Sequence, residues 1–298
     1  MTSHKDSICG IEIRKNLITM AQYSPDENAV GSIVIKPITE TSGEDPEAQL
    51  RGEFKKLISE IELKRRRIVL SLPSELAVVK KISLDSEESS PEDVISWEIS
   101  QNIIGSIEDY SVDFEPIGQD GDVRQYLAVA YRKSSIRKLV SLFRANKLNP
   151  WIVDLDIFAL INVFEANYAE IIASPVLLVL AGEEKTLVII TQAGMLVDFD
   201  VFAYPESVSP DDYSSRLDEY RHNLCGKFVP DVPGPYCAGP LFMHPEFTEA
   251  VSKKLPGALQ LDPFKKIICH AANGENSMSQ FAPQLAVAVG LAIRGRNE

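Results

Sequence analysis

The first part of the chain alternates short apolar runs with polar breaks, a pattern typical of β-strands joined by turns. β-Branched and apolar residues flank a polar centre at Arg14-Lys15-Asn16, and Ile33-Val34-Ile35 follows a break rich in Pro, Asp and Asn. This pattern predicts a hairpin over 8–22 and a third strand after it. Helical spacing and two further apolar runs then predict a helix and two strands, in the order 54–61, 68–72 and 78–84.

The stretch from Val78 to Pro150 has the pattern of a separate α+β module. Ser90-Pro91 is a typical helix start, with a hydroxyl at the cap and proline in the first turn, and isoleucines at helical spacing follow. Two strands are expected next, at 110–117 and 123–131. A second helix should begin at 134 or 135 and stop before Pro150.

The rest of the chain repeats the opening plan. After a helix that begins near 155, three strands are predicted to form a second meander, at 176–180, 186–190 and 195–202. Further helices are expected near 213–224, 246–255 and 284–293. Two meanders, each followed by helices, predict a two-lobed α/β fold.

Composition and charge narrow the function. The chain has 298 residues, 45% of them hydrophobic, and 43 acidic against 30 basic side chains give a net charge of −13. The apolar content excludes intrinsic disorder. The charge argues against nucleic acid as a partner, because phosphate binding needs a basic surface. The basic run from Lys64 to Arg67 follows the first predicted helix, whose C-terminus favours cations.

The sequence gives no sign of membrane insertion or of a metal site. No apolar run reaches the roughly 20 residues that a membrane span requires, and the polar N-terminus lacks the apolar core of a signal peptide. We therefore expect a cytoplasmic protein with reduced cysteines. His222 and Cys225 have metal-like spacing, but no second ligand pair follows, so no metal is expected.

A set of short segments, in order along nearly the whole chain, carries a family resemblance. The segments are Leu70-Ser71-Leu72-Pro73, Val79-Lys80-Lys81-Ile82, Trp97-Glu98, Leu127–Lys133, Val153–Leu160, Leu261–Ile267 and Ala282–Ala292. Together they resemble the type IV pilus assembly protein PilM family of the actin-like superfamily. No single segment is diagnostic, and the resemblance rests on the ordered set.

The resemblance implies an actin-like ATPase fold with an inserted α+β subdomain, as in the cell-division protein FtsA, and a reduced second lobe. The first lobe is expected to begin with residues 1–77, to be interrupted by the inserted subdomain at 78–150 and to resume at 151–174. The reduced second lobe is expected at 175–280, and a C-terminal helix, 281–298, should pack back on the first lobe.

In this fold ATP lies between the lobes, with its phosphates held by the two meander turns. Each turn typically pairs an Asp that organises Mg²⁺ with a Gly that lets backbone N–H groups approach the phosphates. Glu12 stands where relatives have this Asp, and Arg14 where they have the Gly. A Cβ in a left-handed conformation costs about 1–2 kcal/mol, and the Arg14 side chain would occupy the phosphate space. Arg14 could instead bind a phosphate bidentately.

The other nucleotide motifs are also altered. The resemblance places the second Asp at Val179 and its Gly at Ala181, and the adenosine-supporting turn keeps one glycine in Ala238-Gly239. Only a short loop at 204–207 stands where relatives insert the subdomain that walls the adenine. We therefore expect no catalytic residue and no cofactor, with ATP and Mg²⁺ as the alternative.

These features predict a pseudo-ATPase that serves as a scaffold in a type IV pilus or related secretion assembly platform. The resemblance implies docking of the cytoplasmic N-terminal tail of a PilN-like bitopic inner-membrane protein, alongside other platform proteins. The tail is expected in a groove between the first lobe and the inserted subdomain. The side chains expected to line this groove are Val78, Val79, Ile82, Ile95 and Ile99.

Two alternatives stay open. One is an active ATPase with a rebuilt site, in which Glu12 replaces the Asp and Arg14 grips the γ-phosphate. The other is an FtsA-like adaptor that forms polymers, which would produce filaments. The charge of −13 also argues against direct adhesion to an anionic bilayer, so membrane attachment is expected through a protein partner.

Overall fold

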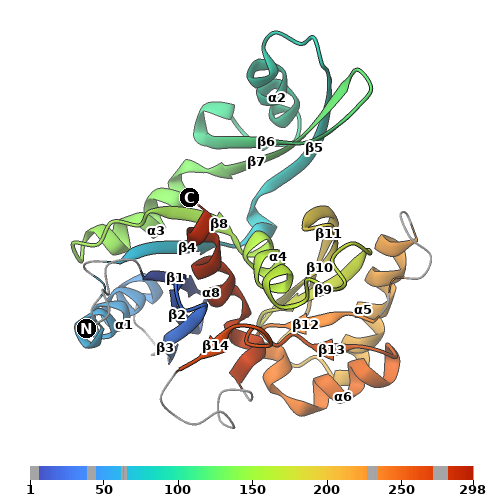
Figure 1. Ribbon diagram of the computed structural model, residues 1–298. Coiled ribbons are helices and arrows are strands. Elements are labelled where there is room, and N and C mark those ends of the chain that lie inside the picture. Colours follow the sequence, from blue (N-terminus) through green and yellow to red (C-terminus); the bar gives the residue numbers. More distant parts are fainter. Residues whose placement is uncertain are drawn as a thin grey trace. The chain divides into compact units, whose positions relative to one another are not determined.

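The computed structural model describes residues 7–38, 45–61, 63, 66–226, 232, 234–270 and 281–297. The chain divides into two compact units, which are described separately (Figure 1). Unit 1 comprises Met1–Leu72 and Leu148–Glu298, and unit 2 comprises Pro73–Lys147.

The first sheet of unit 1 contains the predicted hairpin and third strand. Its strand order is β14-β3-β2-β1-β4-β8, in which β1, β2 and β3 pair antiparallel and the other neighbours pair parallel. The elements are β1 Ile8–Ile13, β2 Leu17–Ser24, β3 Ala29–Pro37, α1 Pro46–Glu60, β4 Arg67–Leu72, β8 Ile152–Leu155 and β14 Ile268–Cys269.

Helix α1 buries Phe54 and Leu57, as its apolar spacing predicts. Its N-terminus is capped by Asp45, whose side chain accepts from the backbone N–H of Glu47. The expectation that the basic run lies at the helix C-terminus is wrong for its described residues. The helix ends at Glu60, so Arg66 lies beyond it and Arg67 begins β4; Lys64 and Arg65 lie outside the described residues.

The second sheet of unit 1 contains the predicted second meander. Its order is β11-β10-β9-β12-β13, with β9, β10 and β11 antiparallel and β12 parallel to β9. Helices α5 and α6 pack with this sheet around a shared apolar core. The elements are β9 Val176–Ala181, β10 Lys185–Gln192, β11 Met195–Ala203, α5 Pro210–Cys225, β12 Tyr236–Ala238, η4 Pro240–Met243, α6 Pro245–Lys254 and β13 Leu259–Gln260.

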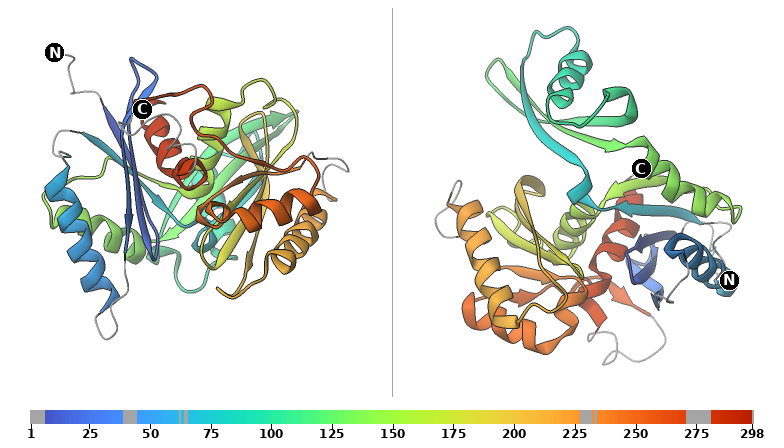
Figure 2. Two further views of the ribbon diagram at one scale, coloured as in Figure 1. Left: turned by 90° about the horizontal axis from the view of Figure 1, so that it is seen from below. Right: turned by 180° about the vertical axis from the view of Figure 1, so that it is seen from behind.

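Two helices, α4 (Asp156–Asn167) and α8 (Ala282–Arg294), pack together between the two sheets of unit 1 (Figure 2). Their backbones touch at Gly290, where a Cβ would overlap the carbonyl oxygen of Ala159. A Cβ at Gly10 on β1 would likewise overlap the carbonyl oxygen of Ala288. Small residues are therefore required where α8 crosses its neighbours.

Unit 2 is a three-stranded antiparallel sheet, β5-β7-β6, with α2 on one face. Ser90 occupies the N-cap position of α2, as predicted, but its side chain makes no capping hydrogen bond. Of the isoleucines that follow Pro91 at helical spacing, Ile95 and Ile99 lie on α2, whereas Ile103 lies beyond its last residue, Ser100. The elements are η2 Ser74–Leu76, β5 Val78–Asp85, α2 Pro91–Ser100, η3 Ile107–Asp109, β6 Tyr110–Asp120, β7 Val123–Arg132 and α3 Lys133–Arg144.

Aspartates engage backbone N–H groups on three of the edge strands. The side chains of Asp113 on β6, Asp154 on β8 and Asp198 on β11 each accept from the N–H of the following residue, at 3.0, 2.7 and 2.9 Å. Asp200 on β11 does the same at 2.8 Å. An N–H engaged in this way is not available to a further strand, which protects these edges from pairing.

Candidate functional site

The two meander turns of unit 1 meet where the resemblance places the phosphates. The Arg14 N–H donates to Leu17 O at 2.8 Å to close the first turn, and the Gly182 N–H donates to Lys185 O at 2.8 Å to close the second. Lys15 Nζ lies 2.9 Å from Glu184 Oε1 across the two turns. Arg14 Nη1 lies 3.7 Å from the position that a Cβ at Gly182 would take. Charged side chains therefore bridge the space between the turns.

Glu12 and Arg14 form a buried ion pair within the first turn. Arg14 Nε and Nη2 lie 2.7 and 2.6 Å from Glu12 Oε1, and the Thr19 hydroxyl donates to Glu12 Oε2 at 3.1 Å. The Glu12 side chain is 4% exposed and the Arg14 side chain 12%. Both oxygens of the carboxylate are thus engaged within the protein.

Burial and the ion pair act in opposite directions on the pKa values of these two groups. Burial raises the pKa of Glu12, while Arg14 and Thr19 act to lower it. Burial opposes the charge of Arg14, but the carboxylates of Glu12, Glu183 and Asp156 outweigh that effect and raise the pKa of Arg14. The guanidinium stays charged in any case. Arg14 therefore sits as a fixed cation among carboxylates.

The second turn differs from its predicted alignment by one residue. Equating the two turn-closing hydrogen bonds matches Arg14 with Gly182, and hence Glu12 with Leu180. Val179 and Ala181 point into the outer core under α5 and α6, away from the side that Leu180 shares with Gly182. By this internal comparison the counterparts of Glu12 and Arg14 are Leu180 and Gly182, one residue beyond Val179 and Ala181. The second turn therefore has a glycine opposite Arg14 and no carboxylate at the position that matches Glu12.

The third motif packs directly against the second turn. Gly239 has φ +106°, and a Cβ there would overlap the carbonyl oxygen of Ala181. Its N–H donates to Pro283 O in the first turn of α8 at 2.8 Å. Ala238 before it is fully buried. The glycine is explained by close packing, and its N–H is already engaged within the protein.

Tyr204, directly after β11, binds the backbone of the second meander turn. Its hydroxyl donates to Gly182 O, and its N–H donates to Glu184 O at 2.8 Å. Burial raises the pKa of Tyr204, so it stays a neutral donor. The connection from β11 to α5 spans only residues 204–209. The described chain therefore places a tyrosine, and no additional subdomain, between these two elements.

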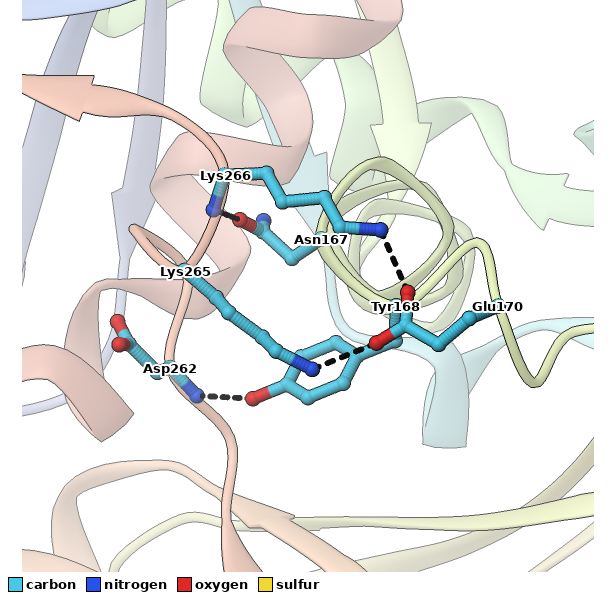
Figure 3. Close-up of polar contacts among 6 residues, drawn as sticks. All are labelled: Asn167, Tyr168, Glu170, Asp262, Lys265 and Lys266. Carbon is cyan, nitrogen blue, oxygen red and sulfur yellow. Dashed lines mark hydrogen bonds and ion pairs between the residues drawn. The ribbon is translucent and has the colours of Figure 1, made fainter.

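A polar cluster ties the end of α4 to the segment that leaves β13 (Figure 3). Asn167 Oδ1 accepts from the Lys266 N–H at 2.8 Å, and the Tyr168 hydroxyl accepts from the Asp262 N–H at 3.0 Å. Glu170 binds the ammonium groups of Lys265 and Lys266, and these hydrogen bonds lower the pKa of Glu170 to about 2. The same segment continues into β14, which pairs with β3 of the first sheet. The lobes of unit 1 are thus joined by this crossing as well as by α4 and α8.

The side chains expected to line a partner groove fall mostly in the core of unit 2. Ile82 on β5 and Ile95 and Ile99 on α2 are buried between the helix and the sheet, because the isoleucine face of α2 turns toward the sheet. Their assignment to a partner surface is therefore wrong. Val78 and Val79 on β5 remain half-buried.

Candidate metal ligands do not converge in the described part of the chain, where no group of three or more His, Cys, Asp or Glu side chains is placed to hold an ion. Of the one pair with metal-like spacing, His222 is exposed and Cys225 is buried. Asp154 in the link to α4 lies 3.5 Å from Arg294 Nε on α8.

Sequence reasoning missed the contacts that close the site. Lys15 and Glu184 are 169 residues apart, and Asn167 and Lys266 are 99 apart. The sequence marks Tyr204 only as part of the short loop at 204–207. No local pattern signals such pairs, although the run Gly182-Glu183-Glu184 opposite Arg14-Lys15 carries complementary charge.

Two sheets whose hairpin turns meet beside a pair of crossing helices define the actin-like class of two-lobed α/β proteins, which confirms the predicted fold class. Within this class, residues 7–203 match the family described as type IV pilus assembly protein PilM, and the chain belongs to that family. The match ends at Ala203, the last residue of β11. A comparison with curated protein sequences finds no significant match.

Solved structures show the same fold. The PilM-PilN type IV pilus biogenesis complex matches with a TM-score of 0.80 at 20% identity, over 97% of this chain and 98% of that chain. A protein with actin-like ATPase fold from Bacteroides thetaiotaomicron matches at 0.56, with 14% identity over 93% and 96%. The cytoplasmic domain of EpsL, an inner membrane component of the type II secretion system of Vibrio cholerae, matches at 0.55, with 11% identity over 98% and 95%.

Among the described residues, no helix combines the length and the hydropathy needed to cross a bilayer.

Proposed function

We propose that this PilM-family chain is a non-catalytic scaffold that docks the cytoplasmic N-terminal tail of a PilN-like inner-membrane protein in a type IV pilus or related secretion assembly platform. The observation that carries the lack of catalysis is the buried Glu12–Arg14 pair. On this proposal the protein is cytoplasmic, binds other platform proteins and reaches the inner membrane only through its partners.

The ion pair opposes a magnesium-bound phosphate between the turns. Such a ligand needs a free carboxylate for the metal waters and open space above the backbone. Glu12 is engaged by Arg14 and Thr19, and Arg14 extends toward Gly182. If Arg14 left, it would strand a buried carboxylate, which typically costs about 3–5 kcal/mol. That cost is comparable to the whole binding energy of a millimolar ligand, about 4 kcal/mol.

The second turn and the lobe connections support the same proposal. Leu180 leaves the second turn without a carboxylate for the metal. Proteins that close around a ligand between lobes need a hinge that lets the lobes move. The cluster around Asn167, Tyr168 and Glu170 adds a further tie between the lobes and resists such a motion.

The rebuilt ATPase is the second candidate, and one observation favours it: two cations, Arg14 and Lys15, stand at the phosphate position. In that case ATP and Mg²⁺ would be ligands, and Arg14 would exchange Glu12 for the γ-phosphate. The two candidates differ in Mg-ATP affinity. The ATPase requires a Kd tighter than about 100 μM, equivalent to roughly 5.5 kcal/mol, that weakens when Arg14 is replaced.

The partner follows from the family and from the edge of unit 2. A solved relative of this fold is a PilM-PilN complex. Strand β5 pairs with β7 on one side and forms an edge of the described sheet. Unlike the edges protected by aspartates, β5 contains no aspartate before its last residue, Asp85. An extended tail could therefore add a strand beside the half-buried Val78 and Val79.

Titration with a synthetic peptide tests this docking. The peptide is the cytoplasmic N-terminal tail of a PilN-like bitopic protein, and the control is the same peptide with alternate backbone nitrogens methylated. We expect the unmodified peptide to bind and the methylated peptide to lose at least about tenfold in affinity, because strand addition uses main-chain N–H donors. No binding by either peptide would remove the scaffold's main support, and equal binding would contradict strand addition.

A further inference from the structure

Unit 2 carries exposed apolar side chains on α2 and in the segment that follows it. Ile95 and Ile99 point into the core, and Trp97, half a helical turn from both, points outward and is 61% exposed. Ile104, four residues past the end of the helix, is 81% exposed. We call Trp97 and Ile104, with the exposed carboxylates of Glu92 and Asp93 on the helix, the α2 surface. Figure 1 shows α2 on this unit.

The position of Ile104 is held by hydrogen bonds. Its carbonyl oxygen accepts from Arg132 Nη2 at 2.9 Å and from the Tyr110 hydroxyl at 3.3 Å, while the Arg132 guanidinium lies over the Tyr110 ring. Gly105 follows with φ +100°, a conformation that favours glycine. The backbone at this exposed isoleucine is thus preorganised, which lowers the entropy cost of using it in an interface.

Acidic side chains outnumber basic ones in this part of unit 2. Residues 82–123 contain twelve Asp and Glu residues and no Lys, Arg or His. Glu98 is paired with Lys80, at 2.6 Å. Arg132 and Lys133, from the end of β7 and the start of α3, are cations in this region that donate to the carbonyls of Ile104 and Glu108, and Arg132 also lies over the Tyr110 ring. Among the described residues, neither Glu92 nor Asp93 on α2 has an ion-pair partner.

We propose that the α2 surface docks a basic amphipathic segment of a partner protein, with its apolar face on Trp97 and Ile104 and its Lys or Arg side chains against the surrounding carboxylates. Exposed tryptophan is the residue type most often central to such interfaces. A second copy of this chain would bring its own excess of acid, because the net charge is −13. An anionic membrane or a nucleic acid is disfavoured for the same reason. This site lies on the helix, not on the β5 edge, and goes beyond the proposed function.

The full chain with Trp151→Phe tests the proposal, because Trp97 then becomes its only tryptophan and reports on its own surroundings. The probe is a synthetic leucine–lysine amphipathic helix of about five turns, and the matched control peptide has glutamate in place of lysine. We expect saturable binding of the lysine peptide with a Kd tighter than about 100 μM and a blue shift of the Trp97 emission. Salt should weaken this binding, and the glutamate peptide should not bind.

Two variants separate this site from general attraction to an acidic protein. Trp97→Ala should weaken the lysine peptide at least about tenfold in fluorescence anisotropy. Met195→Ala, at an exposed apolar residue of β11 in unit 1, should leave the Kd unchanged. Equal affinity for both variants, or no binding by the parent chain, would overturn the proposal. So would a concentration-dependent shift of the Trp97 emission without peptide, since that identifies a second copy as the occupant.

Discussion

Among single residues, Glu12 near the end of β1 and Arg14 directly after it matter most for the proposed lack of ATP binding. Residues i and i+2 of a strand share a face, so Glu12 and Arg14 point to the same side and can pair without help from distant parts of the chain. The pair is buried, and its energetics are therefore asymmetric. Loss of both charges can be nearly neutral, whereas loss of one partner leaves the other charge unpaired.

Replacement of Arg14 by alanine should destabilise the protein by about 3–5 kcal/mol, because Glu12 is then left buried without its cation. The added change Glu12→Gln should restore part of this loss, since it removes the stranded charge. Urea unfolding followed by circular dichroism measures both effects.

Lys15→Ala is the matched control. The Lys15–Glu184 pair bridges the same two turns, but both side chains are about half exposed. Its loss should cost only about 0–1 kcal/mol. Equal losses for Arg14→Ala and Lys15→Ala would contradict the role given to the buried pair.

At the scale of elements, the sequence predicts helices and hairpins, whose apolar patterns are local. It does not predict which residues of a fully buried strand face a given side. The hairpins, α1, α2, α4 and α5 follow from apolar periodicity and turn residues. Strand β9 is apolar and buried on both faces, so no alternation marks which side chains face the first lobe. The sequence therefore does not distinguish Val179 from Leu180 as the counterpart of Glu12. Strands β12, β13 and β14 have only two or three residues each, too few to show an apolar alternation in the sequence.

The crossing of α4 and α8 should tolerate no added side-chain atom at Gly290. Gly290→Ala would push a methyl group into the Ala159 carbonyl, and we expect a loss of about 1–3 kcal/mol. Gly52→Ala on α1 is the control, because nothing lies within 4 Å of the added carbon there and alanine favours a helix. That change should be neutral or stabilising in the same unfolding measurement. A neutral Gly290→Ala would show that the helices are not in close contact.

The cluster at the end of α4 predicts a pH dependence. The folded-state pKa of Glu170, about 2, lies below that of a free glutamate. Its contribution to stability is therefore complete above about pH 4.5 and is lost as the pH falls toward 2. The melting temperature of Glu170→Gln should lie below that of the unchanged protein at pH 7, and the difference should vanish as the pH approaches 2. A difference independent of pH would contradict the ion pairs.

At the scale of the whole molecule, family membership and fold were predictable because they rest on an ordered set of segments spread along the chain. The closure of the site was not, since it depends on side chains that meet across large sequence separations. The net charge of −13 disfavours polyanions as partners. The molecule has an actin-like fold with a buried Glu12–Arg14 ion pair beside the meeting of its two meander turns.

Isothermal titration of the full chain with Mg-ATP separates a scaffold from an ATPase. We expect no saturable binding, or a Kd weaker than about 1 mM. The reason is that Arg14 and Glu12 are paired with each other and that Leu180 offers the metal no carboxylate. A Kd tighter than about 100 μM that is weakened by Arg14→Ala in a folded variant would contradict the account and establish Arg14 as a phosphate ligand.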